Sequence, residues 1–317
     1  MIIRAAVSEH MAGSSGNNQA RSKTALVTGG TDGIGKEIAI GLAADGQHVI
    51  IVGHDESKGI QAKHEILAAS GNINATVEFI CADLSLVSET ERLVKTVTRC
   101  RTKLDYLVPS AGVVLGHRSI TSEGIETNFA LNYLSRFVLI KGLLPMLCTS
   151  GRSDAPSRIL LISGAAMNGA VYFDDVNLTR NFSTIRAVRQ FCRANDLLTI
   201  ELAAQLTKRS SAVTINCLKY GVVKTHIRKN FPWWMKVLVP LLFDPFLGQT
   251  PRDAARDALN LLLADEFART NGSLFLKIRE FKKIPPFNKS VVNDEGQRLW
   301  MRGEQIVAAV SQANAAA

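Results

Sequence analysis

The segment LKYGVVKTH, residues 218–226, contains a tyrosine and a lysine four residues apart, Tyr220 and Lys224. A tyrosine hydroxyl can donate a proton, and an adjacent cation lowers its ordinary pKa, which lies near 10, toward neutrality. Residues at this spacing share one face of a helix, so they could form such a pair. The strand-like run VTINCL precedes them, however, and Gly221 interrupts regular helix. We therefore predict that the spacing is a coincidence within a loop.

A second group of residues could hold a phosphate-containing ligand. The segment LVTGGTDGIGKEIA forms a turn between a strand-like run and a helical one. Glycines let the backbone approach a pyrophosphate, and a helix N-terminus offers N–H groups and a positive dipole end. A turn that binds nothing is the alternative, but its place in the first strand–helix unit favours a dinucleotide site. The residues predicted to bind are Gly29, Thr31, Gly33, Ile34 and Gly35.

The elements that position these residues alternate along the chain. Short apolar runs predict strands at 24–28, 48–52, 76–82, 104–108, 158–163 and 212–218. Helical periodicity predicts helices at 34–46, 57–70, 86–100, 122–148 and about 185–210. Parallel strands need crossover connections, so this order predicts an α/β fold with a doubly wound parallel sheet and helices on both faces (Rossmann-type). We expect a single domain over 24–305, with a polar N-terminal tail, 1–23, and a C-terminal tail, 306–317.

Composition narrows the class of protein. The 317 residues carry a formal net charge of +9, but the basic residues are scattered, which argues against nucleic-acid binding and suits anionic cofactors or an acidic membrane face. Five well-separated cysteines predict reduced thiols and no metal site. The N-terminal stretch has no apolar run typical of a signal peptide, and no window predicts a membrane-spanning helix. We expect a cytoplasmic protein, with association to a membrane surface as an option.

Over residues 24–305 the chain resembles the short-chain dehydrogenase/reductase family. TGGTDGIG is similar to the family's TGxxxGxG turn, and CADLS places Asp83 where the family binds adenine. TNFALNYLSRFVLIKGLLP resembles its long fourth helix, with Asn132 in the position of the active-site asparagine. The segments EGIETNFALNYL, FPWW and GQRLWMRGEQI resemble the retinol-dehydrogenase-like branch, which implies lipophilic alcohols or ketones as substrates.

The resemblance also implies how the nicotinamide cofactor is bound. Relatives that prefer NAD often carry a carboxylate at the end of the second strand, where this chain has Gly53, followed by His54. Without that carboxylate we expect NADP(H) rather than NAD(H). The family's Asn-Asn-Ala-Gly segment is PSAG here, which contains Ser110 and Gly112. In the loop after the sixth strand, Gly221 and Thr225 match positions that contact the cofactor, and Tyr220 stands where the family has proline.

The resemblance places the family's catalytic serine, tyrosine and lysine at other residue types. ANDLLTIELAAQL matches a family helix, and counting back from it puts the tyrosine position at Val188 and the lysine position at Cys192. RILLISGAA puts the serine position at Gly164, although Ser163 could serve after a one-residue slip. Three catalytic candidates therefore remain, Asn132, Ser163 and Tyr220. Other groups that could supply a proton are Tyr172, Lys219 and His226, and Cys192 could be a reactive thiol or an ordinary core residue.

The segment 231–248, FPWWMKVLVPLLFDPFLG, is rich in large apolar side chains, in the region where the family has its substrate lid. It suggests a lipophilic ligand, contact with a membrane surface, or simple packing on the domain.

Three interpretations of the function of the protein stay open. The protein could bind NADP(H) and perform redox-neutral or atypical chemistry on a lipophilic molecule. It could be a non-catalytic partner of an active homologue, paired through the helices around 122–148 and 185–210, so that the chain forms a homo-oligomer or a hetero-oligomer with another short-chain dehydrogenase. It could also be an alcohol or ketone oxidoreductase with a substitute general acid.

Overall fold

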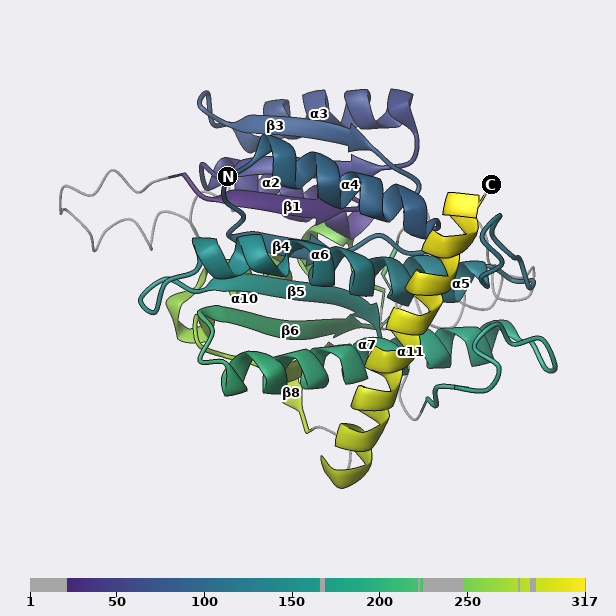
Figure 1. Ribbon diagram of the computed structural model, residues 1–317. Coiled ribbons are helices and arrows are strands. Elements are labelled where there is room, and N and C mark those ends of the chain that lie inside the picture. Colours follow the sequence, from purple (N-terminus) through teal and green to yellow (C-terminus); the bar gives the residue numbers. More distant parts are fainter. Residues whose placement is uncertain are drawn as a thin grey trace.

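The computed structural model describes residues 22–165, 169–221, 223–224, 248–278, 280–285 and 289–316. An eight-stranded sheet with the order β3-β2-β1-β4-β5-β6-β7-β8 runs through its centre (Figure 1). The strands are β1 (Thr24–Thr28), β2 (His48–Gly53), β3 (Thr76–Cys81), β4 (Tyr106–Pro109), β5 (Ser157–Gly164), β6 (Val213–Tyr220), β7 (Ser273–Lys277) and β8 (Phe281–Ile284). β1 to β7 pair in parallel, which confirms the predicted doubly wound α/β fold in one domain.

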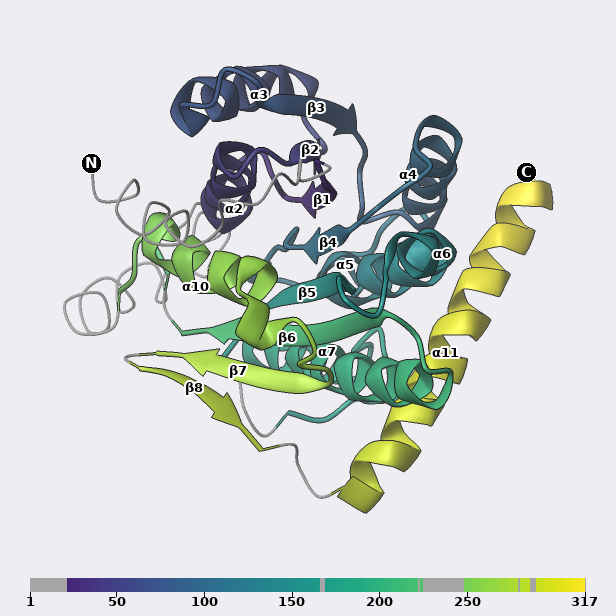
Figure 2. The ribbon, with the colours of Figure 1, turned by 90° about the vertical axis from the view of Figure 1, so that its left-hand side faces the viewer.

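Helices cover both faces of the sheet. They are α2 (Gly33–Ala44), α3 (Glu56–Ser70), α4 (Val87–Cys100), α5 (Thr127–Phe129), the π-helical turn η1 (Ala130–Leu134), α6 (Ser135–Ser150), α7 (Thr184–Lys208), α10 (Pro251–Leu263), the 3-10 turn η4 (Asp265–Phe267) and α11 (Lys289–Ala316). α2, α3 and α10 pack on one face, and α4, α6 and α7 pack on the other (Figure 2). Because both faces are covered, the central strands are apolar on both sides, as in TALVT and RILLIS.

The last two strands were not predicted from the sequence. β7 extends the parallel sheet from β6, and β8 folds back beside it in antiparallel register. β8 is short and forms the edge, where Lys282 and Lys283 are exposed. Exposed lysines on a short edge strand disfavour pairing with another chain. Apart from this strand, the expectation of a parallel sheet is confirmed.

α11 corrects the expected C-terminal tail. The helix continues past residue 305 to Ala316, and Val310 is only 7% exposed, so α11 packs on the core as far as Val310, while residues 312–315 are exposed. Trp300 packs edge-on against Phe137 of α6, with ring centroids 5.1 Å apart. The ion pair between Arg193 of α7 and Glu295 adds a second anchor, with an N–O distance of 2.6 Å. α11 therefore lies across the outer side of α6 and α7 (Figure 1).

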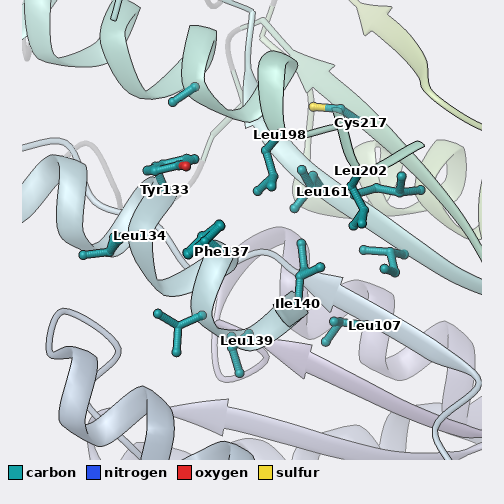
Figure 3. Close-up of a cluster of buried hydrophobic side chains, with 14 of the residues drawn as sticks. Leu107, Tyr133, Leu134, Phe137, Leu139, Ile140, Leu161, Leu198, Leu202 and Cys217 are labelled. Atoms are coloured by element: carbon teal, nitrogen blue, oxygen red, sulfur yellow. The ribbon is translucent and has the colours of Figure 1, made fainter. Parts of the chain in front are cut away.

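The core beneath α11 is built mainly by α6, α7 and the central strands. Tyr133, Phe137, Leu161 and Leu198 meet there (Figure 3). Full burial of such side chains stabilises the fold by about 1.5–3 kcal/mol each. One helical stretch of the described residues, Thr127–Ser150, is long and apolar enough to cross a membrane, but 67% of its most apolar window is buried inside the fold. Its composition is explained by this core.

Candidate active site

The glycine turn between β1 and α2 has the backbone geometry of a close-approach site. Gly29 and Gly33 have φ angles of +65° and +55°, in the left-handed region that favours glycine. A Cβ on Gly35 would overlap the carbonyl oxygen of Gly29, so the turn leaves no room for a side chain there. The Asp32 side chain accepts a hydrogen bond from the Gly33 N–H at the start of α2. The turn therefore fits a dinucleotide phosphate at a helix N-terminus.

The loop after β4 packs directly on this turn. The Thr28 hydroxyl accepts hydrogen bonds from the N–H groups of Ser110 and Ala111, both at 3.1 Å. A Cβ on Gly29 would lie 2.8 Å from the Ala111 Cα, so the two segments touch through their backbones. The fold thus brings Ser110 and Gly112 to the same sheet edge as the glycine turn.

The end of β2 lies beside the glycine turn, at the same edge of the sheet, and carries further residues predicted to bind the cofactor. A Cβ on Gly53 would lie 2.6 Å from the Thr31 methyl carbon, so Thr31 fills the space beside Gly53. His54 is exposed. Asp83, also exposed, accepts hydrogen bonds from the N–H and hydroxyl of Ser85 with Oδ1. These predicted cofactor residues lie together in the structure.

Asn132 lies in the π-helical turn η1, a rare conformation that is frequent at functional sites. Its Oδ1 accepts a hydrogen bond from the Val113 N–H at 3.2 Å, and its Nδ2 donates to the carbonyls of Val113 at 2.7 Å and Asn128 at 2.8 Å. A Cβ on Gly112 would lie 2.6 Å from Asn132 Oδ1. The asparagine is therefore fixed against the loop that packs on the glycine turn.

Ser163 is linked to Asn132 through a residue that had no role in the sequence analysis. The Asn195 Nδ2 donates to the Asn132 carbonyl at 3.0 Å, to the Phe191 carbonyl at 2.9 Å and, at 3.5 Å, to the Ser163 hydroxyl. Ser163 Oγ in turn lies 3.9 Å from Cys192 Sγ. The only sequence signal for Asn195 was its place in the segment ANDLLTIELAAQL.

Two of the three positions where the resemblance expects catalytic residues, Gly164 and Cys192, lie next to each other. Gly164 ends β5, and a Cβ on it would lie 3.2 Å from Cys192 Sγ. Cys192 is fully buried in α7, and Val188, one turn earlier, packs against the core. No disulfide joins any of the five cysteines, all of which lie in the described residues. The thiol thus occupies space next to a strand end that has no side chain.

Lys219, which the sequence analysis considered as a possible proton donor, is fully buried. It is the register partner of Ser163 on the neighbouring strand, and it forms an ion pair with Asp196 of α7. Burial raises the pKa of Asp196, and Lys219 opposes this effect. For Lys219, burial alone would lower the pKa, but the carboxylate and the Cys217 thiol outweigh it and raise the pKa.

The structure does not bring Tyr220 together with Ser163 and Asn132. Tyr220 is the last residue of β6, and its buried hydroxyl donates to the Ala254 carbonyl of α10, on the opposite face of the sheet. After it, the Gly221 N–H donates to the Lys277 carbonyl, and the Lys224 N–H donates to Gln249, so Tyr220 and Lys224 share no helix. Burial raises the pKa of Tyr220 well above its usual range.

Of the other three tyrosines in the chain, one lies beside a cation near α7. Tyr106 begins β4, where its hydroxyl accepts from Lys23, and Tyr133 is buried with Phe129 and Phe137. Tyr172 is partly exposed, and the Arg186 guanidinium lies 3.8 Å from its ring centroid. The Gln190 side chain accepts a hydrogen bond from the Tyr172 N–H and so ties this loop to α7.

Some predicted residues lie outside the described part of the chain. These are Thr225, His226 and the apolar segment 231–248 except for Gly248. Among the described residues, no group of three or more histidine, cysteine or acidic side chains could hold a metal ion.

Comparison with known proteins adds independent evidence on the family of the chain. The model of the family described as short chain dehydrogenase matches residues 23–174. Polyprenol dehydrogenase of Homo sapiens is 31% identical over 282 residues, which cover 88% of this chain and 83% of that protein. Retinol dehydrogenase 13 of Mus musculus is 30% identical over 290 residues, covering 90% and 84%.

Solved structures share the fold. A putative uncharacterized protein from Mycobacterium paratuberculosis superimposes with a TM-score of 0.70 at 22% identity, covering 90% of this chain and 93% of that one. The RhlG/NADP active-site complex of Pseudomonas aeruginosa gives a TM-score of 0.64 at 25% identity, covering 81% and 95%. The region that the family model matches contains the glycine turn and the loop after β4.

Proposed function

The chain belongs to the short-chain dehydrogenase family, in the retinol-dehydrogenase-like branch, and on this premise we propose that it binds NADP(H) and acts on a lipophilic small molecule by a route other than the usual serine–tyrosine–lysine one. The observation that carries this proposal is a contrast between two parts of the site at one sheet edge, the part that would bind the cofactor and the part that would transfer a proton. The glycine turn fits a dinucleotide, whereas the three catalytic positions hold Gly164, Val188 and Cys192. The chemistry would then be redox-neutral or atypical.

The preference for NADP(H) over NAD(H) is supported by the end of β2. Gly53 offers no carboxylate to repel a 2′-phosphate, and Thr31 packs beside it. His54 is exposed next to this position and could contact an added phosphate. Without a nearby carboxylate, a phosphorylated ribose meets no like charge from these two residues.

The lipophilic ligand is supported by the relatives. The names of the human and mouse relatives specify polyprenol and retinol, and both are long apolar alcohols. We propose that this chain takes an alcohol of that kind, or the corresponding carbonyl compound. The apolar segment 231–248 has a composition suited to such a ligand or to the surface of a membrane.

The chain's own groups would act by orientation more than by proton transfer. A bound nicotinamide supplies or accepts a hydride. Ser163, which lies at the end of β5 beside Asn195, would orient a ligand oxygen, and Asn132 would keep the loop after β4 in place. A positioned general acid usually contributes about 10²–10⁴-fold in rate, so its loss would make ordinary carbonyl reduction slow.

A second candidate, an alcohol or ketone oxidoreductase with a substitute general acid, is supported by Tyr172. Its phenol is partly exposed with a guanidinium over its ring, and it lies on the loop after β5, tied to α7 near Val188. A phenol beside a permanent cation is the combination of groups that the family's mechanism uses.

Two measurements separate these candidates. Fluorescence titration with NADPH and NADH tests the cofactor site, and absence of binding would remove both candidates. Incubation with NADP and a panel of long-chain alcohols, followed at the nicotinamide absorbance, then tests turnover. Turnover that is lost in Tyr172→Phe but kept in Tyr106→Phe supports the substitute acid, because Tyr106 lies at the other end of the sheet.

A non-catalytic role as a partner of an active homologue is the third option. The helices around 122–148 and 185–210 were expected to pair with such a partner, but α11 lies across the outer side of α6 and α7. A partner at this face would therefore have to displace α11. Co-purification of an active homologue with the full chain, but not with a chain whose α11 is cross-linked to α7, would support this role.

A further inference from the structure

Arg136 is a buried cation that the proposed chemistry does not use. It lies in α6, one turn after Asn132, and only 4% of it is exposed. Its Nη2 donates to the Ala111 carbonyl at 3.1 Å, while its Nε and Nη1 are buried without a hydrogen-bond partner. Buried guanidinium groups usually have their donors satisfied, because desolvating them is costly. Such an incompletely satisfied cation therefore needs an explanation.

The charge of Arg136 is not neutralised by a carboxylate. In the described part of the chain, no salt bridge involves Arg136, whereas Lys219 pairs with Asp196 and Arg193 pairs with Glu295. The nearby Cys217 and Cys192 oppose the lowering of the pKa of Arg136 that burial causes. Burial lowers the pKa of Arg136 to about 10, so the group stays cationic at neutral pH.

Arg136 lies directly beneath the loop that packs on the glycine turn. The carbonyl that it binds belongs to Ala111, whose Cα would lie 2.8 Å from a Cβ on Gly29. A Cβ on Gly112 would lie 3.9 Å from Arg136 Nη2 and 2.6 Å from Asn132 Oδ1. The loop at residues 111–112 therefore lies between the guanidinium and the glycine turn of the proposed cofactor site. Arg136 is on the same side of this loop as Asn132.

We propose that Arg136 makes this site discriminate between the redox states of the dinucleotide, so that the reduced form binds more tightly than the oxidised form. The oxidised nicotinamide ring carries a positive charge and the reduced ring is neutral. A fixed, unpaired cation in a low-dielectric interior disfavours the oxidised ring and leaves the reduced ring almost unaffected. The inference rests on the proposed function, since it needs a bound nicotinamide dinucleotide, but it is independent of the 2′-phosphate.

Coulomb's law sets the size of the effect. At an effective dielectric of about 20, two unit charges about 10 Å apart interact strongly enough to change an affinity on the order of tenfold. We expect removal of the Arg136 charge to reduce the affinity ratio of reduced to oxidised dinucleotide by roughly three- to tenfold.

The test compares affinities of the full chain for NADPH and NADP, each measured by titration calorimetry. Arg136→Gln removes the charge and can still donate to the Ala111 carbonyl, and Arg136→Met is a second neutral variant if the first does not fold. Arg136→Lys keeps the charge. The matched control is Arg158→Met, because Arg158 is equally buried, 6% exposed, and binds the carbonyls of Leu262 and Ala264 near the beginning of β5, at the far end of the sheet.

The proposal requires the ratio to fall in a folded neutral variant and to stay near that of the wild type in Arg136→Lys and Arg158→Met. An unchanged ratio in the neutral variant overturns it, and so does a fall in Arg136→Lys equal to that in Arg136→Gln. An equal loss of affinity for both redox states would assign Arg136 a purely structural role in the loop. If the wild type binds neither form, the proposed function fails together with this inference, whereas binding with an unchanged ratio leaves the proposed function intact.

Discussion

Lys219 of β6 and Asp196 of α7 form a fully internal ion pair, with Nζ 2.6 Å from Oδ2 and side-chain exposures of 1% and 2%. Lys219 is in register with Ser163, and Asp196 lies one turn after Cys192. The pair therefore lies beside Ser163 and Cys192, two residues that the sequence analysis considered for the active site. It keeps a cation in the same part of the interior as the family's lysine position, but fixes it to a carboxylate.

Removing one partner of this ion pair is expected to lower the free energy of unfolding more than removing both partners. Asp196→Asn or Lys219→Met leaves one buried charge without its partner, which we expect to reduce the free energy of unfolding by about 3–5 kcal/mol. The double variant Asp196→Asn with Lys219→Met should be more stable than either single variant, because no charge remains buried. Urea denaturation of the four proteins measures this, and additive losses in the double variant would contradict it.

The pair also predicts a loss of stability in alkali. Burial alone would lower the pKa of Lys219, but Asp196 raises it above the ordinary value of 10.5. A raised folded-state pKa stabilises the fold fully below pH 10.5, and this contribution disappears as the pH rises through the folded-state pKa. Urea denaturation between pH 7 and pH 11.5 should therefore show a steeper alkaline decline in the wild type than in the double variant, and parallel curves would contradict this assignment.

The glycine turn predicts a cofactor-binding defect. Gly35→Ala should weaken NADPH binding at least about tenfold, because the methyl group overlaps the Gly29 carbonyl and moves the turn. Gly71→Asn is the control, since Gly71 has a φ of +63° with no atom near its Cβ position, and asparagine tolerates that conformation. Fluorescence titration gives both affinities. Wild-type affinity in Gly35→Ala would show that this turn does not contact the cofactor.

Gly164 and Cys192 should be energetically coupled. A Cβ at 164 lies 3.2 Å from Cys192 Sγ, so Gly164→Ser should overpack the site and cost about 1–3 kcal/mol. Cys192→Ala makes room for the serine and should recover part of this loss. A double-mutant cycle measured by thermal unfolding tests the coupling, and strictly additive effects would mean that the two positions adjust independently.

Restoring the usual residues should restore ordinary chemistry if their absence is what limits it. The variant with Gly164→Ser, Val188→Tyr and Cys192→Lys places a hydroxyl, a phenol and an ammonium group at the family positions. We expect its NADPH-dependent reduction of long-chain aldehydes to exceed that of the wild type by about 10²-fold or more. The same variant with Val188→Phe in place of the tyrosine is the control. Equal rates in the wild type and the restored variant would point to a substitute acid already present.

The sequence predicted the parallel sheet and the glycine turn between β1 and α2, because local patterns encode both. The apolar run TALVT and the glycines of TGGTDGIG are local sequence patterns, and they are sufficient to predict β1, the turn and α2. β7, β8 and the continuation of α11 were missed. α11 is defined by Trp300 against Phe137 and by Val310 in the core, which are contacts between residues more than a hundred positions apart.

For the candidate active site, too, some features can be read from the sequence and others only from the tertiary structure. The residue types at 164, 188 and 192 can be read directly from the chain, and so can the absence of a carboxylate at Gly53. Only the tertiary structure decided that Tyr220 faces α10, that Lys219 is paired inside the core, and that Asn195 joins Asn132 to Ser163. Side-chain direction at a strand end and the partner of a buried charge depend on which helix packs over that strand, and no local sequence pattern specifies this.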